Sequence, residues 1–354
     1  MTSVRTRPAM RVAIRVDATV ANGVGHVVRQ LALAEELRAR GHEVTLLGVS
    51  DVPWALRQLA ARGLGFVAPA PPHDVGRQAA GLGADVAIID GYAVPAATGE
   101  ALRAAGIPVA TMVDGRFGVH QRADLYVDQN LNAVRLPELP AAAEFLGGLG
   151  YVLLRDQIRD RRGVASPTSG TPRVLVVFGG TDAYGGARVL VPLLLATGVP
   201  VEVVAVTATE AIAAELAALP TGAGQSMDVH GPVDDLGGLA VTCHAAVSAA
   251  GTTVWELLCL GLPTGLVCVT ENQEFGYLEA GRTRVAGTPV CVPVGRLTEL
   301  RDDAAGRAEA VGRLRGLLTD APLRSEMAAA ARTLVDGDGR VRVADAVERL
   351  AAGR

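Results

Sequence analysis

The sequence predicts an α/β protein made of two doubly wound domains. Its 354 residues exceed what one hydrophobic core usually organises, and 49% of them are hydrophobic, which is ample for two cores. Short apolar runs alternate along the chain with segments that have helical spacing or turn residues. Strands that alternate with helices in this way form parallel sheets with helices on both faces.

The first half begins with a strand, a glycine-rich loop and a helix. An apolar run at Arg11 to Asp17 precedes the loop, and apolar residues at helical spacing follow it until Gly41. Four further strands are expected in this half, at residues 43–49, 85–90, 108–113 and 124–128. Together they predict an N-terminal domain over residues 9–160.

The second half repeats this rhythm after a polar segment. The segment RDRRGVASPTSGTP, residues 159–172, is rich in Pro, Gly and Ser and lacks apolar periodicity, so we expect a linker at 161–172. Strands are expected beyond it at residues 173–178, 201–206, 226–230, 245–248, 263–269 and 288–293. They predict a C-terminal domain over residues 173–354, and its last helix could pack back on the first domain.

Composition excludes several classes of function. A net charge of -4 without long runs of one sign provides no basic stripe for nucleic acid. All 33 basic residues are arginines, which excludes a Schiff-base or P-loop lysine and, with abundant Ala, Gly and Val, points to a GC-rich bacterial genome. The four cysteines lack the spacing of a zinc site or disulfide framework. With no secretory h-region after residues 1–8 and no run that could span a bilayer, we expect a cytoplasmic protein.

The loop Asn22-Gly23-Val24-Gly25-His26 is the main candidate site of the first half. Glycines allow close backbone approach, and the free amides at a helix start attract anions. A dinucleotide fingerprint would place a third glycine at Val28, so nicotinamide and flavin cofactors are disfavoured. His26 is a candidate general base or, alternatively, a capping or packing histidine. Arg29 could pair with a carboxylate or lie on the solvated helix face.

Polar side chains at neighbouring strand ends are candidates to support this histidine. Asp17 ends the first strand and could orient His26 or a sugar hydroxyl, or cap the next helix. Asp90 and Tyr92 follow a strongly apolar strand and could hydrogen-bond a sugar, or form an ordinary turn. Asp114 ends the next strand and has the same two interpretations.

Three loops of the second half have the composition of a nucleotide-sugar site. Phe178 to Asp182 (FGGTD) places two glycines and a hydroxyl after a buried strand, which suits a phosphate or sugar. Ser248 to Thr253 (SAAGTT) opens a helix with small residues, free amides and hydroxyls, which suits a diphosphate. Glu256 is a ribose ligand or a capping-box partner. Asn272 and Gln273 could contact the sugar, or Asn272 could be a plain helix cap.

Taken in order, these loops resemble the UDP-sugar hydrolase of the pseudaminic acid pathway and related glycosyltransferases of the spore-coat and lipid II types. The matching segments are RVDATVANGVGHVVR at 15–29, IIDGY at 88–92, GLGYVLLR at 148–155, FGGTD at 178–182, SAAGTTVWE at 248–256 and Asn272-Gln273. The resemblance implies the GT-B architecture, in which two Rossmann-like domains flank a cleft and the nucleotide lies on the C-terminal domain.

The same resemblance implies roles for individual residues. His26 would be the general base or acid, and Tyr92 and Asn272 would flank the sugar. We count Tyr92, and Asp17 from its place at the strand end, as the other catalytic candidates. The nucleotide-sugar ligands would be Gly23, Gly25, Gly179, Gly180, Thr181, Gly251, Thr252, Thr253, Glu256, Asn272 and Gln273. Among them, residues 251–253 would bind the diphosphate and Glu256 the ribose. Neither a metal nor another cofactor is expected, because helix-end amides neutralise the leaving diphosphate.

Departures from the family pattern favour transfer to an acceptor over hydrolysis. Gly91 stands where the hydrolases have a larger polar residue, no second acid follows Asp114, and Glu271 precedes Asn272. We therefore expect an inverting transferase that moves a sugar from UDP or dTDP to a small acceptor, in bacterial secondary metabolism. Hydrolysis of the same donor and non-catalytic sensing of a nucleotide sugar are the alternatives. The sequence leaves the nucleobase, the acceptor and the oligomeric state open.

Overall fold

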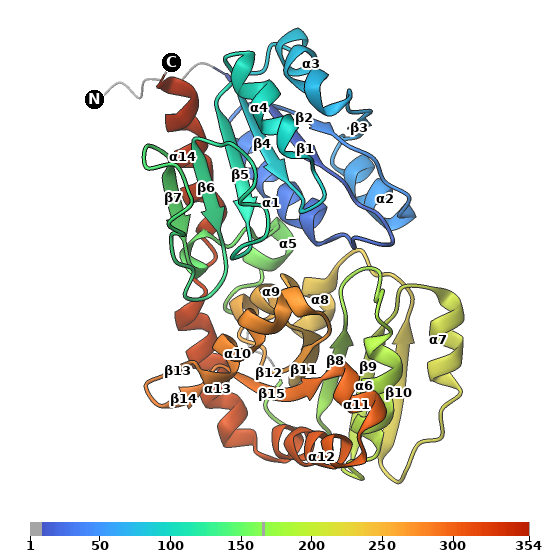
Figure 1. The fold of residues 1–354 in the computed structure, drawn as a ribbon. Helices are drawn as coiled ribbons and strands as arrows, with labels where there is room; N and C mark the ends of the chain where they lie inside the picture. Colours follow the sequence, from blue (N-terminus) through green and yellow to red (C-terminus); the bar gives the residue numbers. More distant parts are fainter. Residues whose placement is uncertain (1–8, 165–166, 354) are drawn as a thin grey trace, which may run out of the picture. The chain divides into compact units, whose positions relative to one another are not determined.

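A computed structural model describes residues 9–164 and 167–353 (Figure 1). Contacts between residues divide the chain into two units. Unit 1 contains the described residues of Met1–Thr19, His26–Leu153 and Asp338–Arg354. Unit 2 contains those of Val20–Gly25 and Leu154–Gly337. Each unit is therefore assembled from more than one stretch of the sequence.

Unit 1 contains a seven-stranded parallel sheet in the order β3-β2-β1-β4-β5-β6-β7. Its strands are β1 (Arg11–Val16), β2 (Glu43–Leu47), β3 (Phe66–Val67), β4 (Val86–Asp90), β5 (Val109–Val113), β6 (Leu125–Asp128) and β7 (Glu144–Gly147). The five strands expected from apolar runs are present. The edge strands β3 and β7 were not expected, because they are short and only partly buried.

Helices lie on both faces of this sheet (Figure 1). They are α1 (Gly25–Ala39), α2 (Pro53–Ala61), α3 (Val75–Gly81), α4 (Ala96–Ala104) and α14 (Gly339–Ala352), with the short 3-10 turns η1 (Pro72–Asp74) and η2 (Leu149–Tyr151). All five residues of β4 are buried, as the doubly covered sheet requires. Ala87 and Ile89 of β4 pack in one core cluster with α3 and α4.

The helix α14 packs within unit 1 although more than 180 residues separate it from the rest of that unit. Its buried Arg340 pairs with Glu35 of α1 at 3.0 Å. Its Glu348 accepts a contact of 3.1 Å from Nε2 of the buried His42. This segment thus joins unit 1 through buried ionic contacts.

Unit 2 contains a six-stranded parallel sheet in the order β10-β9-β8-β11-β12-β15, with a separate small hairpin. Its strands are β8 (Arg173–Val177), β9 (Val201–Val206), β10 (Gln225–His230), β11 (Ala245–Ala249), β12 (Thr264–Cys268) and β15 (Cys291–Arg296), and the hairpin is β13 (Arg284–Val285) with β14 (Thr288–Pro289). The single strand expected at residues 288–293 is wrong, because its first two residues belong to the hairpin and the sheet strand starts later.

The helices of unit 2 are α5 (Asp156–Arg159), α6 (Gly186–Leu195), α7 (Glu210–Ala217), α8 (Leu236–Ala240), α9 (Thr253–Leu260), α10 (Glu274–Arg282), α11 (Leu297–Asp302), α12 (Ala304–Thr319) and α13 (Ala321–Leu334), with the 3-10 turn η3 (Glu271–Gln273). A core cluster joins the sheet to α6 and α12. Across residues 9–164 and 167–353, none of the helices combines the length and apolar character that crossing a membrane would take.

The change from unit 1 to unit 2 lies between Leu153 and Leu154, earlier than the linker expected at 161–172. The reason is local packing, since α5 contacts α8 and α9, and Gln157 donates to the carbonyl of Asp234. Residues 165–166 of the expected linker, and residues 1–8, which bear on the expected lack of a leader, lie outside the described part of the chain.

In both sheets the strand order reverses beside the first strand. The reversal falls between β1 and β4 in unit 1, where Val16 is in register with Asp90. It falls between β8 and β11 in unit 2, where Val177 is in register with Ser248. Open parallel sheets bind ligands beyond the carboxyl ends of their strands at such a reversal. The loops that follow these four strands are therefore where each unit should carry its chemistry.

Candidate active site

His26 lies in the first turn of α1, after a loop in which Gly23 has a φ of +76°. Its Nδ1 is 2.7 Å from Oδ1 of Asp90, the fully buried last residue of β4. A proton on Nδ1 can therefore be donated to this carboxylate, which leaves Nε2 with a lone pair to accept a proton. The pair has the arrangement of a general base and the acid that orients it.

Arg29, one helical turn after His26, holds two aspartates together. Its Nε and Nη2 each donate to Asp90 at 2.7 Å, and its Nη1 donates to both oxygens of Asp114 at 3.1 Å. The side chain is only 2% exposed, so the carboxylate-pairing interpretation of Arg29 holds and the solvated-face one is wrong. Gln30 donates to the second Asp90 oxygen at 2.8 Å. Asp90 is thus fully engaged by protein groups, which rules out the direct sugar contact considered for it.

These ion pairs fix the charge states of the cluster. Burial by itself raises the pKa of Asp90, but the charges of Arg29 and His26 and their hydrogen bonds outweigh burial and hold that pKa well below its usual range. Burial likewise raises the pKa of Asp114, but the charge and hydrogen bonds of Arg29 outweigh it, and that pKa is also lowered. Burial lowers the pKa of Arg29, but Asp114 and Asp90 raise it further. Both carboxylates and the guanidinium are therefore ionised at neutral pH.

Tyr92 and Asn130 complete the surroundings of Asp114. The Tyr92 hydroxyl donates to Asp114, and Nδ2 of Asn130 donates to it at 2.9 Å. The Tyr92 ring meets the His26 ring edge-on, with centroids 4.6 Å apart. Burial and the charge of Asp114 raise the pKa of Tyr92, so the phenol stays protonated. Tyr92 therefore packs against the histidine as a neutral side chain.

Asp17 lies apart from this cluster in its contacts. Both of its oxygens accept hydrogen bonds from Arg15, at 2.6 and 2.8 Å, and one also accepts from the amide of Val49. Residues two apart on a strand share a face, so Arg15 is placed to take this carboxylate. The sequence suggested that Asp17 orients His26. In the structure, Asp90 makes that contact instead.

In unit 2, the loop after β8 is shaped by its own aspartate. The buried Asp182 accepts hydrogen bonds from the amides of Gly186, at 2.6 Å, and Ala187, at 3.1 Å, at the start of α6. Gly179 has a φ of +71°, a conformation that favours glycine. The predicted ligands Gly179, Gly180 and Thr181 therefore lie in the turn between β8 and α6.

The start of α9 offers hydroxyl and amide groups. Ser248 donates its hydroxyl to the carbonyl of Val177 at 2.8 Å and so links β11 to β8. Thr252 occupies the cap position but makes no capping hydrogen bond with its side chain. The first amides of a helix lack partners within that helix and carry a partial positive charge. The amides of Val254 and Trp255 bond to the carbonyls of Gly251 and Thr252, so the Thr252 hydroxyl and the Thr253 amide are the groups placed to donate to an anion.

Glu256 forms a buried ion pair with Arg155. The Arg155 Nη2 and Nε lie 2.8 and 3.2 Å from the same Glu256 oxygen, Oε1, and both side chains are buried. The guanidinium fixes the orientation of the carboxylate and satisfies one of its oxygens. Sequence reasoning missed this role for Arg155, although the residue ends the GLGYVLLR segment.

The turn η3 brings its polar side chains toward the loop of Gly251. Gln273 Oε1 accepts from the amide of Val269 at 3.3 Å, and its Nε2 is 3.4 Å from where a Cβ on Gly251 would stand. Asn272 accepts a hydrogen bond from the hydroxyl of Thr270. The cap of α10 is Gln273 and not Asn272, so the plain-cap interpretation of Asn272 is wrong. Among the residues that the structure describes, no group of three or more His, Cys, Asp or Glu is placed to hold a metal.

Comparison with known proteins shows what this chain resembles. No model of a protein family matches the chain. A curated relative from Halorhodospira halophila (strain DSM 244 / SL1) is the UDP-N-acetylglucosamine–N-acetylmuramyl-(pentapeptide) pyrophosphoryl-undecaprenol N-acetylglucosamine transferase. It is 29% identical over an alignment that covers 96% of this chain and 100% of the relative.

Two solved structures share the fold. MurG from Acinetobacter baumannii aligns with a TM-score of 0.66 and 18% identity over 97% of this chain and 100% of its own. The spinosyn forosaminyltransferase SpnP aligns with a TM-score of 0.65 and 16% identity over 98% of this chain and 100% of its own. The predicted fold class is thereby confirmed: the chain has the GT-B fold of two Rossmann-like domains, and it resembles glycosyltransferases, which are enzymes, over nearly its full length.

Proposed function

We propose that the protein is a metal-independent, inverting glycosyltransferase that moves a sugar from a nucleoside diphosphate to a hydroxyl of a small acceptor. The observation that carries the proposal is His26 held 2.7 Å from the buried carboxylate of Asp90, which Arg29 in turn fixes. The glycosyltransferase relative, alignable from end to end, supports it.

In the proposed reaction, Nε2 of His26 accepts the proton of the acceptor hydroxyl. The acceptor oxygen bonds to the anomeric carbon from the face opposite the leaving group, and the bond from that carbon to the β-phosphate oxygen breaks. The nucleoside diphosphate leaves with the electron pair, so the anomeric configuration inverts. Asp90 stays ionised because its pKa is held low, and its charge stabilises the imidazolium that forms.

In the same proposal, unit 2 binds the donor. The amides at the start of α9 and the Thr252 hydroxyl would bind the diphosphate, and Gly179 to Thr181 would border it. Glu256 would accept from the ribose hydroxyls through the oxygen that Arg155 leaves available. Asn272 and Gln273 would contact the sugar. The amides neutralise charge on the leaving diphosphate without a proton transfer.

Hydrolysis of the donor is the second candidate, because a histidine oriented by an aspartate would activate a water molecule by the same chemistry. None of the three compared proteins is described as a hydrolase, so the resemblance to the pseudaminic acid hydrolase stays a prediction.

The test is incubation with a panel of UDP- and dTDP-sugars, first alone and then with a panel of small hydroxylated acceptors, followed by mass spectrometry. We expect one donor to yield a glycoside and a nucleoside diphosphate only when an acceptor is present. Rapid release of free sugar without an acceptor would establish the hydrolase instead. Epimerised or otherwise rearranged donor would overturn both, and tight donor binding without turnover would favour the sensor.

A further inference from the structure

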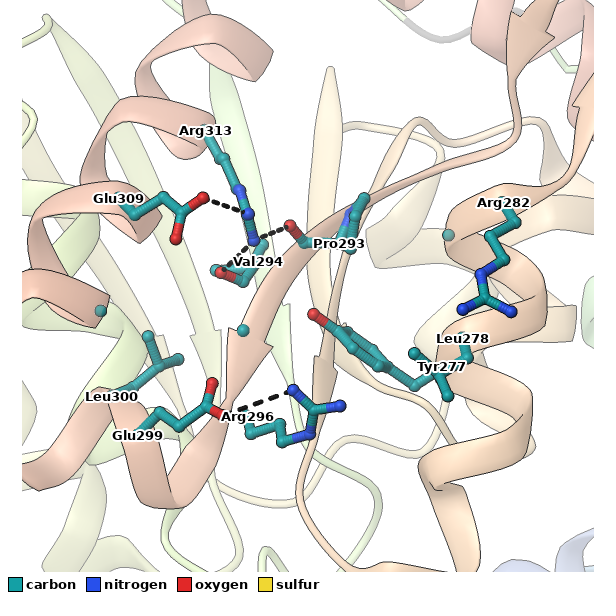
Figure 2. A pocket seen from close by; sticks show the side chains of 13 residues that line it. Tyr277, Leu278, Arg282, Pro293, Val294, Arg296, Glu299, Leu300, Glu309 and Arg313 are labelled. Atoms are coloured by element: carbon teal, nitrogen blue, oxygen red, sulfur yellow. Dashed lines mark hydrogen bonds and ion pairs between the residues drawn. The ribbon is translucent and has the colours of Figure 1, made fainter. Parts of the chain in front are cut away.

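Unit 2 has a pocket of about 360 Å³ beside β15, the outermost strand of its sheet. Residues of α10, β15, α11 and α12 line it, and Figure 2 shows their side chains converging on one space. None of the residues assigned to the donor or to catalysis lines this pocket. Its volume falls in the range of sites for small molecules.

The floor of the pocket is fixed by an irregularity in β15. The pairing with β12 shifts register there, so that Val294 is an extra residue between Pro293 and Gly295. Nη1 of Arg313 donates to the carbonyls of Pro293, at 2.8 Å, and Val294, at 3.2 Å. The bulged backbone is thereby satisfied, and the side chains of Pro293, Val294 and Leu300 give the pocket an apolar wall.

A buried phenol supplies a donor to the pocket. Tyr277 is only 6% exposed, and Figure 2 shows its hydroxyl directed from α10 toward β15 among the lining side chains. Within the described residues, the hydroxyl has no hydrogen-bond partner. Burial raises the pKa of Tyr277, so the group carries a proton at neutral pH. The hydroxyl therefore faces the pocket as a donor, and the oxygen of a ligand there would accept from it.

Among the described residues, one cation of the pocket lining has no acidic partner. Glu309 pairs with Arg313, and Glu299 lies 3.3 Å from Arg296, so both acids of the lining are neutralised. Arg296 also binds Glu274. Arg282, at the end of α10, has no acidic partner among the described residues and lines the pocket near Tyr277. With Glu274 counted, three arginines and three glutamates balance here, so Arg282 is the group with which an anionic ligand would pair.

We propose that this pocket binds a small carboxylic acid with an apolar ring or chain. Its carboxylate accepts hydrogen bonds from the Tyr277 hydroxyl and from Arg282, and its apolar part packs on Leu278, Pro293 and Leu300. One charged contact with a few apolar neighbours is the usual composition of a small-molecule site. The proposal is independent of the proposed transferase activity.

Sodium benzoate is the probe, and benzamide is its neutral isostere. Binding of each to the full chain is followed by saturation-transfer NMR and calorimetry, without any sugar nucleotide. We expect saturable binding of benzoate that is about tenfold tighter than that of benzamide, since tenfold corresponds to one charge-assisted contact of about 1.4 kcal/mol. Absent benzoate binding, or equal affinity for the two compounds, would overturn the proposal.

Two variants locate the site. Tyr277→Phe removes only the hydroxyl and Arg282→Gln only the charge, and each should weaken benzoate binding by about fivefold to tenfold. Tyr184→Phe and Arg188→Gln are the matched controls, since both residues lie in unit 2 outside the pocket lining and should leave the affinity unchanged. Should Tyr277→Phe fail to fold, the exposed Arg282→Gln still decides the matter. Unaltered affinity in Arg282→Gln, or equal weakening in Arg188→Gln, would refute the assignment.

Discussion

At the end of β4 in unit 1, two carboxylates, a guanidinium, an imidazole and a phenol share hydrogen bonds; Asp90 and Arg29 are buried and the other three are partly buried. At the start of α9 in unit 2, the donors placed for a ligand are the hydroxyl of Thr252, which makes no capping hydrogen bond, and the helix-end amide of Thr253. Moving a proton requires a side chain that titrates, and its neighbours must fix its tautomer. Holding a diphosphate requires donors that never titrate. In the proposed reaction, the same strand reversal would serve two chemistries with different groups.

The largest effect should come from His26. His26→Ala removes the proposed base and should lower kcat by about a thousandfold, within the range for general base catalysis. Donor affinity should stay within about twofold, because the proposed donor ligands in unit 2 are untouched. Initial rates and calorimetry with the active nucleotide sugar measure both, with the exposed His73→Ala as the control. An undiminished rate would remove His26 from its proposed role.

The second largest effect is expected from Asp90→Asn, which should lower both the rate and the stability. Asp90→Asn leaves the buried Arg29 with Asp114 as its remaining carboxylate, and should lower the free energy of unfolding by about 3 kcal/mol. Urea unfolding at pH 7 measures it. The control is Asp17→Asn, whose partly exposed ion pair with Arg15 should contribute less than about 1 kcal/mol.

The lowered pKa values of Asp90 and Asp114 also predict the direction in which stability changes with pH. A carboxylate with a lowered folded-state pKa contributes stability above its ordinary pKa, and that contribution is lost as pH falls toward the folded-state value. The wild type should therefore lose stability below about pH 4, and Asp90→Asn should lose less over the same interval. Parallel pH profiles for the two proteins would contradict the ion-pair account.

On the side of unit 2, Thr252→Val should weaken binding of UDP or dTDP by about tenfold, because one hydrogen bond to a charged oxygen is lost. The turnover number should change much less than in His26→Ala. Calorimetry with the nucleoside diphosphate measures the affinity. Thr319→Val, on the exposed end of α12, is the control. Wild-type affinity in the Thr252 variant would place the diphosphate elsewhere.

The smallest effect is expected from Tyr92→Phe. Asp114 keeps Arg29 and Asn130 as donors, so removal of the hydroxyl should lower the free energy of unfolding by about 1 kcal/mol. The ring still packs against His26, and the rate should fall only a fewfold. Tyr151→Phe is the comparison for stability. A loss of rate as deep as that of His26→Ala would give the phenol itself a part in the chemistry.

The sequence predicted the strands well where apolar runs were long, and poorly where strands are short or interrupted by a hairpin or a bulge. The strands β1, β4 and β8 are buried apolar runs and were expected, whereas β3 is two residues long. The region of β14 and β15 was misassigned because a hairpin and a bulge interrupt one apolar stretch. Periodicity does not encode either feature.

The site shows the same limit at the level of contacts. His26 followed from its motif, but its partner Asp90 is 64 positions away and becomes adjacent only through the pairing of β1 with β4. Asp17 was nearer in the sequence, yet Arg15 takes its carboxylate. Arg155 and Glu256 are 101 positions apart. Such pairs depend on strand order and register, which local patterns leave open.

The place of α14 in unit 1 has a consequence for folding during synthesis. Residues 154–337, which hold most of unit 2, leave the ribosome between the body of unit 1 and the helix that completes it. At 5–20 residues per second, that interval lasts roughly ten to forty seconds. During this interval, Glu35 and His42 lack the α14 side chains that bind them in the complete protein. The unit whose synthesis begins first therefore receives its last helix only after most of unit 2 has been made.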